Sequence, residues 1–237
     1  MSGFDARLAK VIDHTFLGPA GDADAVRKLC REAKKYCFAS VCVNPSEVPL
    51  AARLLKKSGV KVCTVIGFPL GATTVTAKYY EAVDALANGA EELDFVINQR
   101  LLKYDPDLCF NELDVLSRLC HAEKPGALLK LILECCNLTR EEIVRGCRLA
   151  KKAGFDFVKT STGFGKGGAT VEDVRLMRRT VGAKMGVKAA GGIRTREDAL
   201  AMLAAGANRL GCSAGVEIVR ERKKEEVRRK KVEKKVE

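Results

Sequence analysis

The sequence of 237 residues has little of what metal sites are usually built from. Its only histidines are His14 and His121, and none of its ten cysteines forms a Cys-x-x-Cys pair. Zinc sites need closely spaced ligands of these two types, so we expect no metal and no cofactor. We interpret the cysteines as reduced thiols that pack like small apolar side chains.

Long apolar runs are also missing. No stretch reaches the roughly 18 consecutive apolar residues of a transmembrane helix, so we expect no membrane partner. The N-terminal segment contains Asp5, Arg7 and Lys10 and lacks the hydrophobic region of a signal peptide. The sequence therefore predicts a protein of the cytoplasm.

The formal net charge of +12 is unevenly distributed. Residues 220–237 contain ten Lys or Arg and five Glu, which leaves +7 for the preceding residues. This tail has no aromatic residue to stack on bases, and glutamates interrupt its basic runs, so we do not expect a nucleic-acid partner. A tail that binds nucleic acid is kept as the non-enzymatic alternative. The net positive charge of the residues before 220 suits an anionic small molecule as ligand.

Short β-rich runs alternate with longer amphipathic segments along the chain. Strands are predicted at 11–14, 38–43, 61–66, 92–97, 128–133, 155–160, 185–189 and 209–211. Helices are predicted near 22–35, 46–57, 74–88, 107–122, 139–152, 170–181, 195–204 and from 213 onward. Such alternation is typical of parallel strands joined by crossover helices. We predict an α/β fold, a single-domain (β/α)8 TIM barrel over residues 1–219, with a charged C-terminal extension at 220–237.

Glycines between the predicted helices and strands support this repeat. Gly59, Gly89, Gly154 and Gly206 lie where a helix would end in a positive φ angle. The alternative architecture is a doubly wound open sheet, which would need a glycine-rich nucleotide loop after its first strand. Residues 14–19 offer no such loop, so the barrel is favoured.

Three ionisable residues lie within otherwise apolar strands: Asp94, Lys159 and Lys188. Side chains alternate along a strand, so Lys159 shares a face with Phe157, and Lys188 shares one with Gly186. Alone, each could be a strand-end charge that reaches solvent. Together they predict two lysines that project into the barrel from neighbouring strands, which is costly unless the charges are paired or functional.

A buried pair of lysines has a chemical use. An ordinary lysine, with a pKa of about 10.4, is almost entirely protonated at pH 7, and only the neutral amine attacks carbonyls. Burial and a cationic neighbour both favour the neutral form. Lowering the pKa to about 7 costs roughly 4 to 5 kcal/mol. Lys159 is the predicted nucleophile, and Asp94 would relay protons through water.

Glycine-rich segments follow the last three predicted strands, at 160–168, 190–194 and 211–215. Backbone N–H groups in such segments can approach an anion closely, and barrels commonly bind phosphate after strands seven and eight. One such loop would be weak support, since turns use glycine in any case. Three on one rim predict a phosphate site.

Six segments resemble the deoxyribose-phosphate aldolase family, and the resemblance extends from about residue 12 to residue 219. They lie at 12–15, 42–45, 65–71, 92–98, 158–165 and 187–194. The string Lys-Thr-Ser-Thr-Gly at 159–163 is highly specific, whereas the paired glycines recur in other phosphate-binding barrels. The resemblance implies a metal-free class I aldolase that cleaves 2-deoxy-D-ribose 5-phosphate into acetaldehyde and glyceraldehyde 3-phosphate. The enzymatic alternative is another phosphate-binding barrel, such as an isomerase or a different Schiff-base aldolase.

By position, the resemblance assigns the Schiff base to Lys159, a perturbing and relaying role to Lys188, and a share of proton transfer to Asp94. Asp13 would support water or substrate hydroxyls near the mouth of the barrel. The remaining residues expected to bind substrate or its phosphate are Thr160, Gly163, Gly191, Gly192, Arg194, Gly211 and Ser213.

Two departures from the family pattern affect these expectations. Ala214 stands where members often have a second serine, which removes one side-chain contact to phosphate. The chain also ends without the tyrosine that some members direct into the site, so proton delivery would rely on water. The expected partner is a small sugar phosphate. We also expect a homo-oligomer, a dimer or a tetramer, although no sequence feature chooses between them.

Overall fold

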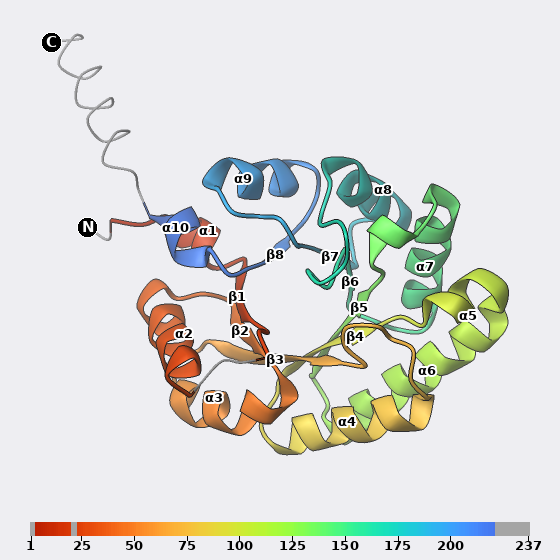
Figure 1. Ribbon diagram of the computed structural model, residues 1–237, viewed down its shortest axis with the longest axis horizontal. Helices are drawn as coiled ribbons and strands as arrows, with labels where there is room; N and C mark the ends of the chain where they lie inside the picture. Colours follow the sequence, from red (N-terminus) through yellow and green to blue (C-terminus); the bar gives the residue numbers. More distant parts are fainter. Residues whose placement is uncertain (1–2, 20–22, 221–237) are drawn as a thin grey trace, which may run out of the picture.

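A computed structural model describes residues 3–19 and 23–220 of the protein. Eight parallel strands close into a barrel in sequence order, with helices around the outside (Figure 1). The predicted TIM barrel is therefore confirmed. The strands are β1 Ile12–Phe16, β2 Ser40–Val43, β3 Lys61–Ile66, β4 Glu92–Val96, β5 Leu128–Ile132, β6 Phe157–Lys159, β7 Gly186–Ala190 and β8 Arg209–Cys212.

Helices connect consecutive strands, as the alternation predicted, and one more helix follows β8. They are α2 Ala23–Tyr36, α3 Val48–Leu55, α4 Val75–Ala87, α6 Pro106–Glu123, α7 Arg140–Lys152, α8 Val171–Val181, α9 Arg196–Ala204 and α10 Gly215–Val219. Three short elements were not predicted: α1 Ala6–Ala9, α5 Gln99–Tyr104 and the 3-10 helix η2 Cys135–Asn137. They are too short for a helical period to stand out in the sequence. A further 3-10 helix, η1 Pro45–Glu47, overlaps the start of the helix predicted at 46–57.

Local signals explain where several helices begin and end. Thr139 caps α7 in a capping box with Glu142, and Thr170 caps α8 by accepting a hydrogen bond from the Asp173 N–H. The helix-end glycines have positive φ angles, as expected: Gly59, Gly89, Gly154 and Gly206. Each of these helices therefore ends where the chain must turn back into the barrel.

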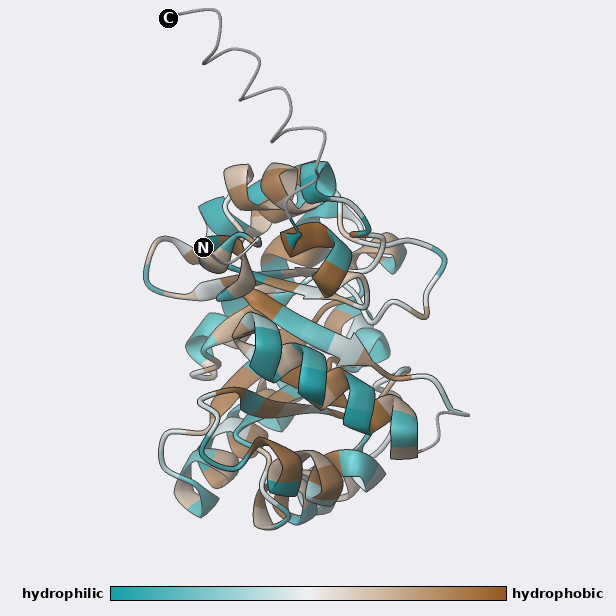
Figure 2. Ribbon diagram, turned by 90° about the vertical axis from the view of Figure 1, so that its left-hand side faces the viewer, coloured by the Kyte–Doolittle hydropathy of each residue, from teal (hydrophilic) through white to brown (hydrophobic). Residues whose placement is uncertain are grey.

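The helices pack on the outer face of the barrel. In Figure 2 they carry both hydrophilic and hydrophobic residues, the composition of a helix with one face on a core. Within the described part of the chain, no helix has the length and apolarity needed to cross a membrane. The predicted extension at 220–237 lies outside the described residues except for Arg220, whose guanidinium donates to the Tyr36 hydroxyl. The boundary at residue 219 stays a prediction.

The register of β6 and β7 bears directly on the site. Phe157 is opposite Gly186, and two residues further along Lys159 is opposite Lys188. A methyl group on Gly186 would overlap the Phe157 ring, so the two residues face the same side of the sheet. The two lysines therefore enter the barrel interior side by side, as alternation predicted.

We expect Gly186→Ala to destabilise the protein by about 1–3 kcal/mol, because the ring cannot make room in a packed barrel. Denaturant unfolding would measure the change in the free energy of unfolding. The control is Gly3→Ala, since nothing lies within 4 Å of the position that its methyl group would take. Equal effects of the two substitutions would contradict this packing.

Candidate active site

The barrel interior holds a buried network of charged side chains from six strands. All are buried apart from Arg209, which is mostly buried. The network comprises Asp13 of β1, Glu92 and Asp94 of β4, Lys130 of β5, Lys159 of β6, Lys188 of β7 and Arg209 of β8. Since burying charge is expensive without partners, the contacts among these groups determine the site.

Asp94 lies at the centre of this network. Its Oδ2 is 2.8 Å from the amines of both Lys159 and Lys188, and its Oδ1 is 2.8 Å from Lys130 Nζ. Burial works to raise the pKa of the Asp94 carboxyl, but the three ammonium groups outweigh it and hold the pKa well below its ordinary value. Asp94 is therefore a carboxylate shared by three lysines.

Two further carboxylates, Asp13 and Glu92, form ion pairs with Lys188 and Lys130. Lys188 Nζ is 2.5 Å from Asp13, and Lys130 Nζ is 2.7 Å from Glu92. Arg209 donates to both of these carboxylates. Burial opposes the charge on Lys188, but Asp13 and Asp94 outweigh it and raise the pKa of this lysine above its ordinary value. Lys188 is thus held as an ammonium ion.

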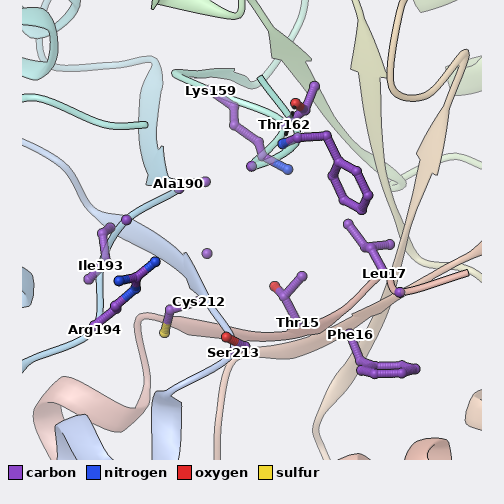
Figure 3. A pocket seen from close by; sticks show the side chains of 16 residues that line it. Thr15, Phe16, Leu17, Lys159, Thr162, Ala190, Ile193, Arg194, Cys212 and Ser213 are labelled. Carbon is purple, nitrogen blue, oxygen red and sulfur yellow. Dashed lines mark hydrogen bonds between the residues drawn. The ribbon is translucent and has the colours of Figure 1, made fainter. Parts of the chain in front are cut away.

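A cavity of about 350 Å³ opens above Lys159. Figure 3 shows the Lys159 amine and the Arg194 guanidinium entering it from different sides. Six residues predicted to bind phosphate line the cavity: Gly163, Gly191, Gly192, Arg194, Gly211 and Ser213. The glycine-rich loops after β6, β7 and β8 therefore meet at one place.

Several donors in these loops are free to meet an anion. Within residues 3–19 and 23–220, the N–H groups of Gly163, Gly192 and Ser213 have no acceptor. No carboxylate in the same described ranges pairs with the guanidinium of Arg194. Unpaired backbone N–H groups beside a cationic side chain are well suited to a phosphate.

Two predicted binding residues do not line the cavity. Asp13 is fully buried below it, between Lys188 and Arg209, rather than near the mouth. Thr160 is also fully buried, and its hydroxyl bonds to the backbone N–H and C=O of Ala190. In this structure Thr160 ties the end of β6 to the end of β7.

Sequence reasoning missed part of the charged network: Lys130, Glu92 and Arg209. Lys130 carried a detectable signal, because it is a lone charge in Leu128–Ile132, as Lys159 is in β6. Glu92 and Arg209 begin their strands, where a charge ordinarily reaches solvent. Sequence reasoning also missed the cavity wall at the end of β1 and just beyond it, formed by Thr15, Phe16, Leu17 and Gly18.

Two cysteines adjoin Asp94. The sulfurs of Cys42 and Cys63 and an oxygen of Asp94 lie within 4.8 Å of one another, a grouping able in principle to hold a metal ion. However, the Cys63 thiol donates to Asp94 Oδ1 at 3.3 Å, and ammonium groups occupy both Asp94 oxygens. Burial first of all raises the pKa of Cys63 well above its ordinary value. Cys63 is therefore a thiol, and the carboxylate is already satisfied.

Known proteins resemble this chain along most of its length. The family model described as DeoC/LacD family aldolase matches residues 7–221. A deoxyribose-phosphate aldolase of Clostridium perfringens is 58% identical over 212 residues, covering 90% of this chain and 94% of that protein. One of Thermococcus gammatolerans is 58% identical over 221 residues, covering 92% and 97%.

A solved structure shares the fold as well. The deoxyribose phosphate aldolase of Aeropyrum pernix, described as a tetramer, has a TM-score of 0.84 and 36% sequence identity. The match covers 90% of each chain. The fold and the sequence thus point to the same group of proteins.

The buried charges predict how stability depends on pH. Asp13 and Asp94 have lowered pKa values, so their contribution is fully present above the ordinary value of 3.8 and is lost as the pH falls through the folded-state pKa. Lys130 and Lys188 have raised pKa values, so theirs is fully present below 10.5 and is lost as the pH rises through the folded-state pKa. Urea unfolding across pH should show a plateau between these limits.

We expect Asp94→Asn to destabilise the protein by about 3–5 kcal/mol at neutral pH, because it leaves buried ammonium groups without their shared carboxylate. The variant should also show a shallower loss of stability in acid. Asp114→Asn is the control, since Asp114 pairs with the exposed Arg118 and should cost less than about 1 kcal/mol. An unchanged acid limb in Asp94→Asn would count against the network.

Proposed function

The chain belongs to the DeoC/LacD family of aldolases, and from its site we propose that Lys159 forms a Schiff base with 2-deoxy-D-ribose 5-phosphate. The products would be acetaldehyde and D-glyceraldehyde 3-phosphate, in a reversible reaction. One observation carries the proposal: the Lys159 amine lies in a cavity whose other walls carry the Arg194 guanidinium and backbone N–H groups without an acceptor in residues 3–19 and 23–220. The names of the relatives support the choice of substrate.

The pattern of contacts favours Lys159 as the nucleophile. The network has four basic groups and three carboxylates, so loss of one proton makes it neutral. Lys130 and Lys188 each contact two carboxylates, whereas Lys159 contacts Asp94 alone and shares that oxygen with Lys188. Lys159 is therefore the amine of the network with the fewest carboxylate contacts. It is also the network's amine that lines the cavity.

The chemistry follows from an amine in this position. The neutral amine adds to the C1 aldehyde of the sugar, and loss of water gives an iminium ion. Removal of the O3 proton then breaks the C2–C3 bond and releases glyceraldehyde 3-phosphate. The two remaining carbons stay on Lys159 as an enamine, which is protonated and hydrolysed to acetaldehyde.

Lys188 and Asp94 have the contacts needed for proton transfer. Both amines meet Asp94 Oδ2, so a proton lost by Lys159 has a short path to the carboxylate that also contacts Lys188. Lys188, held charged by Asp13, supplies a proton close to Lys159. Water completes the relay to the substrate.

We also propose that the reaction needs no metal ion. The Schiff base itself accepts the electrons of the breaking bond, which is the task a Lewis acid would otherwise perform. Of the two thiols and the carboxylate that approach one another, the Cys63 thiol donates to Asp94, and both oxygens of Asp94 already bind lysine amines. Asp94 thus holds lysines in place instead.

The remaining expectations concern location and partners. All ten cysteines are unpaired, which suits a reducing cytoplasm. The tetramer described for the Aeropyrum pernix relative supports a homo-oligomer. The ligand of the proposal is a sugar phosphate rather than a nucleic acid.

Borohydride added with acetaldehyde should trap a two-carbon adduct on Lys159, because reduction makes the Schiff base permanent. Peptide mass spectrometry would locate the adduct. Label on another lysine, or no label, would instead favour a different phosphate-binding barrel enzyme.

We expect Lys159→Leu to abolish cleavage of deoxyribose 5-phosphate, a loss of at least about 10³-fold, since no other amine of the network lines the cavity. A coupled assay for glyceraldehyde 3-phosphate would measure the rate. Lys184→Leu is the matched control, because this lysine is exposed and does not line the cavity. Circular dichroism should show both variants folded.

Dialysis against a strong chelator should leave the rate of cleavage unchanged, because the proposed electron acceptor is the iminium ion. The same coupled assay would measure the rate with and without added divalent cations. A rate that falls on dialysis and returns with one cation would overturn the metal-free mechanism while leaving the adduct experiment valid.

A further inference from the structure

Glu134 is a buried acid with an unusual backbone. It lies two residues after the end of β5, is 6% exposed, and has left-handed angles of φ 55° and ψ 64° that non-glycine residues seldom adopt. Among the residues that the structure describes, no lysine, arginine or histidine forms an ion pair with it. A buried carboxylate with no cation must be satisfied by other donors.

The principal donors come from a single residue, Thr162. Its N–H lies 3.3 Å from both Glu134 carboxylate oxygens, and its hydroxyl donates to Oε2. The Thr162 hydroxyl oxygen in turn accepts a hydrogen bond from the Phe164 N–H at 3.0 Å. Glu134 therefore fixes the backbone on both sides of Gly163.

The consequence falls on Gly163 itself. The Thr162 N–H donates to Glu134, and the Phe164 N–H donates to the Thr162 hydroxyl. The Gly163 N–H between them has no acceptor in residues 3–19 or 23–220. Gly163 lines the cavity and has a φ angle of 87°. A donor held in this way costs a bound anion little reorganisation.

Hydrogen bonds from Gln99 and close packing against Gly165 also hold Glu134 in place. Gln99 Nε2 donates to the carbonyl oxygens of Leu133 and Glu134, at 2.8 and 3.1 Å, which supports the left-handed turn. On the other side, a methyl group on Gly165 would lie 3.0 Å from the Glu134 carboxyl carbon. The loop after β6 thus lies directly against this acid.

We propose that Glu134 is a positioning residue for the substrate phosphate: through Thr162 it holds the Gly163 N–H ready to bind the phosphate in the cavity. This inference rests on the proposed function. Glu134 does not line the cavity, so it acts through the loop and not by contact with substrate. Its effect should therefore depend on whether the sugar carries a phosphate.

The test compares 2-deoxyribose 5-phosphate with unphosphorylated 2-deoxyribose. Glu134→Ala removes both acceptor oxygens and should raise KM for the phosphorylated sugar about tenfold, a loss of about 1.4 kcal/mol of binding. Its kcat/KM for 2-deoxyribose should stay within about twofold of wild type. Glu134→Gln keeps one acceptor oxygen and should give an intermediate KM.

Further variants separate positioning from a general structural role. Thr162→Val removes the hydroxyl link but keeps the shape, and should raise the same KM even if Glu134→Ala folds poorly. Glu141→Gln, an exposed position on α7, should match wild type on both sugars. The acetaldehyde adduct on Lys159 should still form in Glu134→Gln and Thr162→Val.

The outcomes distinguish the two proposals. If wild type cleaves neither sugar, the proposed function fails. If wild type prefers the phosphorylated sugar and both the Glu134 and Thr162 variants keep that preference, the positioning role is wrong. An equal loss on both sugars in the folded variants would also overturn it, because a merely structural defect acts without regard to the phosphate.

Discussion

The shared carboxylate of Asp94 is the interaction on which the rest of the site depends. Three ammonium groups from consecutive strands, Lys130, Lys159 and Lys188, meet its two oxygens at 2.8 Å. Loss of that carboxylate would leave Lys159 without a carboxylate partner among the described residues and would take one of two from Lys130 and Lys188. Lys130 and Lys188 each contact a second carboxylate, whereas Lys159 contacts Asp94 alone.

The fold makes this sharing possible. A closed barrel of parallel strands directs alternate side chains inward, so groups far apart in the sequence converge at one level. Asp13 and Glu92 contribute a second set of charges, bridged by Arg209, that neutralises Lys188 and Lys130 without reaching the cavity. One amine of the network, that of Lys159, therefore lines the cavity.

The proposed reaction uses two different kinds of contact in one cavity. Side chains inside the barrel perform the covalent chemistry, whereas backbone N–H groups in the loops and Arg194 would hold the phosphate. The acid in the left-handed turn after β5 belongs to neither group, since it contacts the loop after β6 and not the cavity. The conformation of the loop after β6 thus links Glu134 with the backbone donors of the proposed phosphate site.

The order of the strands, most of the helices, and Lys159, Lys188 and Asp94 as inward-facing candidates were predictable from the sequence. They depend on local patterns: alternation, capping residues, helix-end glycines, and lone charges in apolar strands. The same rule applied to β5 would have found Lys130.

Tertiary structure alone decided which charges share Asp94, that Asp13 and Thr160 are buried away from the cavity, and that Glu134 holds Thr162. Thr162 and Glu134 are 28 positions apart in the sequence, and Lys188 and Asp94 are 94 positions apart. Barrel closure sets such distances, and no local sequence pattern records them.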